Sequence, residues 1–264
     1  MSPALRYSPL LLPLFIGPAM AAEPVNCTVI LDARSGAVLL REGTCDQRFA
    51  PFSSFKLPLA VMGFDAGILV DDVTPRWEWH AGLTAPQRDH KPVDPTIWER
   101  DSVLWYSREV TRLLGPEAFG RYVAALDYGS EDVSGAPGKD NGLTHAWIGA
   151  SLTISPDEQV AFMRRLLHGA LPVSADAQGW AVSILPDFTA GEWAVSGKTG
   201  SGWVSDTSGA FYRDQPLGWF VGWALRGEAA VVFARLRVDA QRTDGNLGPI
   251  VREGFLADLP ALMP

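Results

Sequence analysis

Residues 219–238, WFVGWALRGEAAVVFARLRV, contain the clearest fold signal in this sequence. Trp219 to Leu225 and Ala229 to Val238 are rich in β-branched and aromatic residues, and Arg226-Gly227-Glu228 provides a turn between them. This pattern predicts an antiparallel hairpin near the C-terminus. A further strand is predicted shortly before it, from Trp193 to Lys198.

A second hairpin is predicted near the N-terminus. Cys27 to Leu31 and Ala37 to Leu40 are strand-like, and Arg34-Ser35-Gly36 joins them. The pairing would bring Cys27 near Cys45, and an oxidising compartment would favour a disulfide between them. The alternative is two free buried thiols.

The middle of the chain is predicted to be helical. The segments are Ser102 to Leu114, Glu117 to Leu126, and a helix that starts at Ser155-Pro156-Asp157-Glu158 and stops at Gly169; a last helix covers Leu247 to Leu262. Strands at both ends with helices between them predict an α+β fold. We expect an antiparallel sheet built from both chain ends, with flanking helices and a helical insertion.

The composition bounds the possible functions. The chain has 264 residues, 47% of them hydrophobic, which is enough for a full core. There are 22 Lys and Arg against 30 Asp and Glu, so the net charge is −8 and nucleic-acid binding is disfavoured. No metal is expected, because the histidines lack metal-ligand spacing: His80, His90, His145 and His168.

The first 21 residues have the pattern of an export signal. Arg6 gives a positive start, Leu10 to Ile16 are apolar, and Ala19-Met20-Ala21 resembles a cleavage site. The apolar stretch is far shorter than the roughly 20 residues of a spanning helix. We expect cleavage near Ala21/Ala22, a periplasmic location without a membrane anchor, and one domain over residues 22–264.

Lys56 lies in an apolar run, Phe55 to Met62, with no acidic neighbour. Such a lysine either extends to the surface or is desolvated, and desolvation lowers the pKa of its ammonium. The neutral amine would accept a proton or react with carbon dioxide. Ser53 lies three residues earlier, so on a helix its hydroxyl shares a face with the amine, as covalent catalysis requires.

Lys198-Thr199-Gly200 follows the predicted strand that begins at Trp193. A lysine and a hydroxyl beside a glycine that admits close backbone approach would hold an anionic substrate along the strand. Taken alone, the same three residues also suit an ordinary turn. In this order, however, S-x-x-K and K-T-G form the signature of serine β-lactamases and penicillin-binding proteins.

Over essentially its whole length after the export signal, the chain resembles the class D (oxacillinase-type) β-lactamases. The matching stretches are Ser53-Ser54-Phe55-Lys56, Ser102-Val103-Leu104, Tyr128-Gly129-Ser130, Asn141-Gly142-Leu143-Thr144, Trp147 with Ser151-Leu152, Ile154-Ser155-Pro156, Lys198-Thr199-Gly200 and Gly218-Trp219-Phe220-Val221-Gly222-Trp223. The resemblance implies a serine β-lactamase/transpeptidase-like fold. It also implies hydrolysis of the β-lactam ring of penicillin-type antibiotics, and hence antibiotic resistance.

By that resemblance, Ser53 is the acylated nucleophile. Lys56, carbamylated to N6-carboxylysine by carbon dioxide or bicarbonate, is the general base. Ser102 relays a proton toward Lys198, and the indole of Trp147 steadies the carbamate, although core packing is an alternative for any tryptophan. The backbone N–H groups of Ser53 and Ser201 form the oxyanion hole. The expected substrate contacts are Lys198, Thr199, Gly200, Ser201, Tyr128 and Leu104.

The residues themselves agree with the choice of base. Hydrolysis of an acyl-enzyme needs a base poised near pH 7. The glutamate that class A enzymes use has no counterpart here, because no E-x-x-L-N pattern occurs. Lys56 is therefore the expected base for hydrolysis of the acyl-enzyme.

Three points depart from the family pattern. Leu104 stands at the third position of S-x-V, where we expect an effect on water access to the base. Ser130 stands at the third position of Y-G-N, where we expect tuning rather than loss of activity. No arginine aligns clearly with the one that meets the substrate carboxylate. Arg252 in the closing helix is the candidate, while Arg235 and Arg237 lie on a strand, and any of the three would also suit an exposed surface.

Two other functions share this fold. A β-lactam sensor domain acylates and stops, and a peptidoglycan transpeptidase or carboxypeptidase would usually bring extra domains or an anchor. We expect a hydrolase, because the sequence contains neither a membrane segment nor a signalling part. The oligomeric state stays open between monomer and homodimer.

Overall fold

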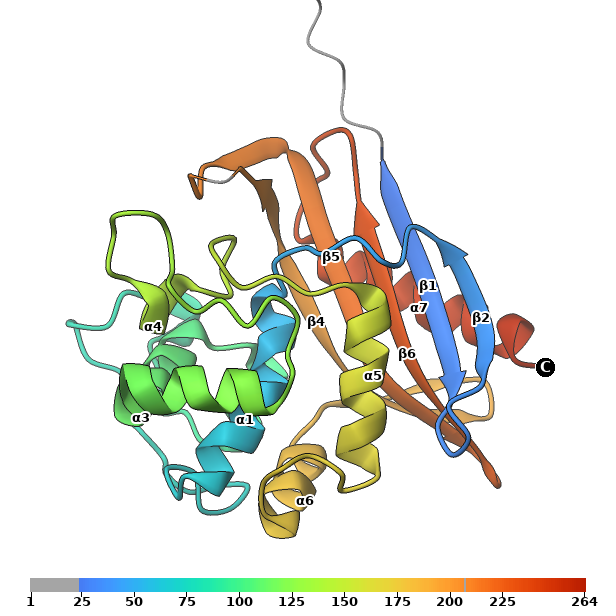
Figure 1. Ribbon diagram of the computed structural model, residues 1–264, viewed down its shortest axis with the longest axis horizontal. Coiled ribbons are helices and arrows are strands. Elements are labelled where there is room, and N and C mark those ends of the chain that lie inside the picture. The colour runs from blue at the N-terminus through green and yellow to red at the C-terminus, as the bar shows by residue number, and fades with distance from the viewer. Residues whose placement is uncertain (1–23, 207) are drawn as a thin grey trace, which may run out of the picture.

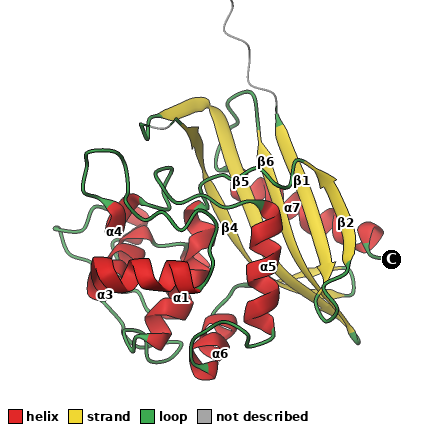
Figure 2. Cartoon of the chain, viewed as in Figure 1, coloured by secondary structure: helices red, strands yellow, loops and turns green. Residues whose placement is uncertain are grey.

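The computed structural model describes residues 24–206 and 208–264, so the expected export signal at residues 1–21 lies outside the described part. Its centre is an antiparallel sheet in the order β2-β1-β6-β5-β4-β3 (Figures 1 and 2). The strands are β1 (Val25–Asp32), β2 (Val38–Gly43), β3 (Asp187–Ala190), β4 (Trp193–Ser205), β5 (Phe211–Arg226) and β6 (Ala229–Val238). Because β1 pairs with β6, both chain ends build the sheet, as predicted.

The five predicted strands are correct in position, and four of them are too short. β6 has the predicted bounds, whereas β4 and β5 extend well beyond theirs. Their ladder continues to Trp203 opposite Pro216, through small and polar residues that lack a strand-like pattern. β3 was not predicted, since its four residues are too few to show an alternating pattern.

Cys27 and Cys45 form a disulfide, with their Cα atoms 5.2 Å apart. Cys27 lies opposite Gly43 in the β1–β2 ladder. The backbone N–H of Thr44 donates to the carbonyl of Asn26 at 2.9 Å. This hydrogen bond joins the residues directly before the two cysteines and so places Cys45 beside Cys27. The predicted bond is therefore confirmed.

Helices cover both faces of the sheet (Figure 1). α7 (Leu247–Leu262) packs on one face, where the ring of Phe255 lies 4.0 Å from that of Phe233, centroid to centroid. α5 (Pro156–Leu167) packs on the other face, and a helical region adjoins it. This region contains η1 (Phe52–Phe55), α1 (Lys56–Asp65), η2 (Gln87–Asp89), α2 (Pro95–Asp101), α3 (Leu104–Ala125), α4 (Gly142–His145) and α6 (Ala175–Ser183). None of the helices described is both long and apolar enough to cross a bilayer.

Helix boundaries follow the capping residues. α5 begins with the predicted capping box, in which the Ser155 hydroxyl accepts from the backbone N–H of Glu158 at 3.2 Å. The two helices predicted over residues 102–114 and 117–126 form one run, α3, with a kink at Gly115, where φ is 73°. The prediction that this helix starts at Ser102 is wrong. Ser102 instead ends α2, which Asp94 caps through the backbone N–H of Ile97 at 2.8 Å.

Candidate active site

Ser53 and Lys56 lie where η1 passes into α1. Three residues of helical backbone place their side chains on one face. Lys56 Nζ lies 3.3 Å from Ser53 Oγ, within hydrogen-bond distance. The pair expected from the sequence is therefore formed in the structure.

Lys56 is almost completely buried, with 1% of its surface exposed. Burial, and after it the nearby positive charge of Lys198, lower the pKa of its amine from 10.5 to about 7, although the negative charges of Glu99 and Asp89 oppose the shift. The desolvated alternative of the sequence analysis thus holds, and extension to the surface does not. The lowered pKa makes the neutral amine accessible, so the group is available as a base or as a nucleophile.

The segment that carries Ser53 packs against Trp147. The backbone N–H of Phe52 donates to the carbonyl of Trp147 at 3.0 Å, and the Phe55 ring stacks on its indole at 5.4 Å. Phe52 has a φ of 49°, a left-handed conformation that is unfavourable for a side chain of this size. Trp147 therefore lies directly against the turn that carries Ser53.

Ser102 and Lys198 come together although 96 positions separate them. Lys198 Nζ donates to Ser102 Oγ at 3.1 Å. Ser102 has a left-handed backbone, with φ of 59°, at the end of α2, and this conformation aims its short side chain toward β4. Lys198 is 3% exposed; burial lowers the pKa of its amine, an effect that the negative charge of Glu99 opposes.

Gly200 brings β4 against the turn from Pro51 to Ser54, which we call the nucleophile turn because it carries the expected nucleophile Ser53. A Cβ atom built on this residue would lie 2.5 Å from the carbonyl oxygen of Pro51 and 3.2 Å from the backbone nitrogen of Ser54. Only glycine permits this approach. The next residue, Ser201, joins the strand to α7, because its hydroxyl accepts from the backbone N–H of Gly248 at 2.9 Å.

A cleft of about 320 Å³ lies beside Lys198 and is lined by Arg100, Pro186, Asp187, Phe188, Gly197, Lys198, Thr199 and Arg252. Arg252 lies over the Phe188 ring at 4.8 Å and also forms an ion pair with Glu253. Arg235 and Arg237 instead pair with acidic residues elsewhere. Of the three arginines considered from the sequence, Arg252 is thus the one that shares a cleft with the K-T-G residues.

The structure does not bring Tyr128 to the substrate side. Its side chain is fully buried, its hydroxyl reaches Gln159 Oε1 at 3.4 Å, and its ring packs on Phe55. The expected substrate contact is therefore corrected to a core position beneath the nucleophile. Ser130 supports the neighbouring loop, since its hydroxyl donates to the Ser151 carbonyl at 3.1 Å. Leu104 is half-buried at the start of α3.

Two residues near this site were not predicted from the sequence. Glu99 on α2 is fully buried, and burial raises the pKa of its carboxyl to about 7. Arg242 lines a second cleft, of about 110 Å³, with Ser201. Neither residue has a clear sequence signal, because Glu99 lies in a charged run and Arg242 in a polar loop.

Comparison with known proteins extends these observations. Residues 26–254 match the family described as penicillin binding protein transpeptidase domain. The chain is 46% identical over 244 residues to β-lactamase OXA-9 of Klebsiella pneumoniae, which covers 91% of this chain and 89% of the relative. The crystal structure of the OXA-427 class D β-lactamase is 38% identical, with a TM-score of 0.83 over 89% of this chain and 97% of that one. The chain belongs to the class D β-lactamases.

The predicted family, fold class and enzyme class are therefore confirmed for this class D β-lactamase. Its fold is shared more widely. The C-terminal domain of the Bacillus licheniformis BlaR penicillin-receptor has a TM-score of 0.74, over 91% of this chain and 92% of that one, at 20% identity. That likeness shows the fold alone.

Proposed function

We propose that this class D β-lactamase hydrolyses penicillin-type antibiotics through an acyl-enzyme on Ser53, and so confers resistance. The observation that carries the proposal is the contact of 3.3 Å between Ser53 Oγ and the amine of the buried Lys56. A serine hydroxyl is a weak nucleophile until a neighbouring base takes its proton. Lys56 is the base within reach.

Lys56 also fits modification by carbon dioxide, because only a neutral amine reacts with this molecule. Its burial and its pKa near 7 provide that neutral form at physiological pH. Once attached, carbon dioxide would supply a carboxylate-type base at the end of the side chain. Trp147, packed against the nucleophile turn, is the proposed support of the modified group.

The proposed reaction has two halves. Ser53 Oγ bonds to the lactam carbonyl carbon while the base at position 56 takes its proton. The ring C–N bond then breaks, and the leaving nitrogen receives a proton through Ser102 from Lys198, whose side chains lie 3.1 Å apart. Between the halves, the base loses this proton to solvent and Lys198 regains one, so both groups are reset. In the second half, the base takes a proton from water as the water oxygen bonds to the ester carbon. The C–O bond to Ser53 then breaks, and the base returns the proton to Ser53 Oγ.

Substrate binding is proposed for the edge of β4. The carboxylate of the antibiotic would meet Lys198, Thr199 and Arg252 in their shared cleft, where cationic groups favour an anion. The backbone N–H groups of Ser53 and Ser201 are the proposed oxyanion hole. Gly200 keeps these two segments in contact.

We also propose that the enzyme is exported to the periplasm and that residues 1–21 are its signal. The N-terminal sequence pattern supports this location. The disulfide between Cys27 and Cys45 supports it as well, since such bonds persist in oxidising compartments.

Purified enzyme tests the proposal with benzylpenicillin and a chromogenic cephalosporin. We expect continuous turnover by the wild type, no acylation of Ser53→Ala, and a stable acyl-enzyme by mass spectrometry in Lys56→Ala. Lys139→Ala, which changes an exposed lysine, is the control and should keep full activity. Removal of carbon dioxide should abolish turnover, and bicarbonate should restore it.

A single stoichiometric burst without turnover in the wild type would instead show a sensor that acylates and stops. Rescue by bicarbonate should weaken as the pH falls below 7, because the amine of Lys56 is then protonated. Full activity at all pH values without carbon dioxide would exclude the modification and leave the bare amine as the base.

A further inference from the structure

Glu99 is a buried carboxyl group for which the proposed reaction has no use. Its side chain has no exposed surface, and neither carboxylate oxygen has a hydrogen-bond partner within residues 24–206 and 208–264. Buried polar groups are nearly always hydrogen-bonded, and an unpaired buried carboxylate is strongly disfavoured. A carboxyl kept in this state is a candidate for a functional role.

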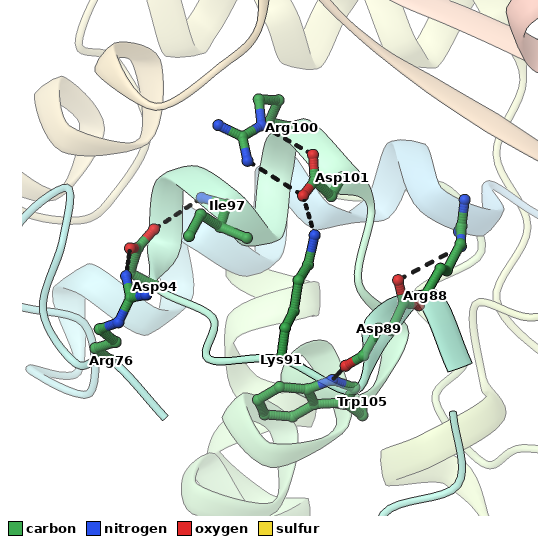
Figure 3. A network of polar contacts seen from close by, with 9 residues as sticks. All are labelled: Arg76, Arg88, Asp89, Lys91, Asp94, Ile97, Arg100, Asp101 and Trp105. Carbon is green, nitrogen blue, oxygen red and sulfur yellow. Dashed lines mark hydrogen bonds and ion pairs between the residues drawn. The ribbon is translucent and has the colours of Figure 1, made fainter. Parts of the chain in front are cut away.

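The charges on the exposed side of α2 balance one another without Glu99. The adjacent Asp101 forms ion pairs with Lys91 and Arg100, as Figure 3 shows. Glu99 directly precedes Arg100 on the helix but lies on its buried side, whereas Arg100 is well exposed. Its helix ends three residues later at Ser102, the hydroxyl of which contacts Lys198.

The charges that act on Glu99 are therefore those of the active site. Lys198 on β4 and Lys56 on α1 both favour its charged form, while its burial opposes that form. Around them, Asp89 on η2 and Arg108 on α3 act on Lys56. Arg252 on α7 acts on Lys198. The three buried groups Lys56, Lys198 and Glu99 form one coupled unit, which we call the buried triad.

We propose that Glu99 takes up the proton that Lys56 releases when carbon dioxide attaches to it. The inference rests on the modification of Lys56 proposed above. In this step the amine nitrogen bonds to the carbon of carbon dioxide, an electron pair of one C=O bond moves onto its oxygen, and the nitrogen loses one proton. If Glu99 binds that proton, the net charge of the buried triad does not change.

The physical reason is the cost of two anions in one buried site. Before the reaction, a charged Glu99 is balanced by the ammonium of Lys198. Afterwards the end of Lys56 is also negative, and a single ammonium cannot balance both. The neutral carboxylic acid is then the favoured form of Glu99, and burial already raises its pKa to about 7 before the second anion forms.

The test counts protons with ¹³C-labelled carbon dioxide. The modified Lys56 is followed by ¹³C NMR, and the half-saturating concentration of dissolved carbon dioxide is measured at pH 7.5 and pH 8.5. In the wild type, we expect the affinity for carbon dioxide to rise less than threefold over this interval, because little net proton is released. In Glu99→Gln the proton must go to solvent, so the affinity should rise about tenfold.

Two variants serve as controls. Glu99→Asp keeps an acid at the site and should restore the weak pH dependence, which a merely structural role would not predict. Glu117→Gln makes the same chemical change at an exposed position of α3 and should behave as the wild type. Equal pH dependence in Glu99→Gln and the wild type would overturn the proposal.

Infrared difference spectroscopy of the wild type provides a second measurement that needs no variant. Addition of carbon dioxide should produce the band of one protonated carboxylic acid, and its absence would also overturn the proposal. If the wild type shows no ¹³C signal for a modified lysine, the modification itself fails. If the ¹³C signal of the modified lysine forms but no carboxylic acid band appears, the modification stands and only the proposed role of Glu99 is contradicted.

Discussion

Replacement of Gly200 by alanine should impair acylation without unfolding the enzyme. The new Cβ atom would lie 2.5 Å from the Pro51 carbonyl oxygen, about 0.9 Å closer than ordinary van der Waals contact at 3.4 Å. Because the opposing atom belongs to the backbone, β4 and the nucleophile turn must separate by a similar distance. A misplacement of about 1 Å costs about 100-fold in rate, or about 2.7 kcal/mol of transition-state stabilisation.

The acylation rate constant is measured by stopped-flow with a chromogenic cephalosporin, and the acyl-enzyme on Ser53 by mass spectrometry. Two other Gly→Ala changes separate catalysis from stability. At Gly179 in α6 the new Cβ atom meets nothing within 4 Å beyond its own stretch of helix, so neither activity nor stability should fall. At Gly63 in α1 the new atom meets the Leu69 side chain at 2.9 Å, so stability should fall while acylation stays close to normal.

Thermal unfolding should show Gly200→Ala to be folded. An acylation rate within threefold of the wild type in this folded variant would refute the reasoning. The contact between β4 and the nucleophile turn would then be a packing feature, and the position of Ser53 would not depend on it.

Three further predictions concern the surroundings of the site. Ser102→Ala removes the acceptor of the Lys198 amine and should slow acylation about 100-fold with little change in KM, measured by stopped-flow; an unchanged rate would exclude the relay. Arg252→Ala should raise KM for penicillins about tenfold, whereas Arg242→Ala should not, and the opposite order would place the carboxylate in the smaller cleft. A hydrogen bond from a neighbouring arginine lowers the pKa of Asp101 from 3.8 to about 2, so its stabilising effect is complete above pH 3.8 and is lost as the pH falls through 2. Asp101→Asn should therefore lower the free energy of unfolding by about 1 kcal/mol at pH 7, by urea denaturation, with the difference shrinking between pH 4 and pH 2.

The sheet could be predicted because its signals are local. The hairpin of β5 and β6 and the hairpin of β1 and β2 each lie within a short stretch, with apolar strands around a glycine turn. The first half of β4 was found for the same reason. Its second half was missed, because residues such as Gly200 and Gly202 disfavour strands and are retained for their close approach to the nucleophile turn.

Some contacts of the site could be predicted from sequence spacing, whereas others could not. Ser53 and Lys56 lie one helical turn apart, so sequence spacing alone placed them together and the apolar run indicated burial. The contact of Ser102 with Lys198 joins two distant segments, and only the family resemblance pointed to it. The same resemblance suggested a substrate contact for Tyr128, which packing places in the core instead.

Glu99 shows why a charge pattern cannot be assigned from sequence alone. It belongs to Glu99-Arg100-Asp101, a run that would normally indicate a solvated surface. Successive residues of a helix point about 100° apart, however, so a run of three charges necessarily spans more than one side of α2. Tertiary packing decides which charge faces inward, and here the charges of two buried lysines act on the inward carboxyl. Desolvation predicts the direction in which the pKa of Lys56 moves, but the carboxyl that shares its protons becomes visible only when the three segments are folded together.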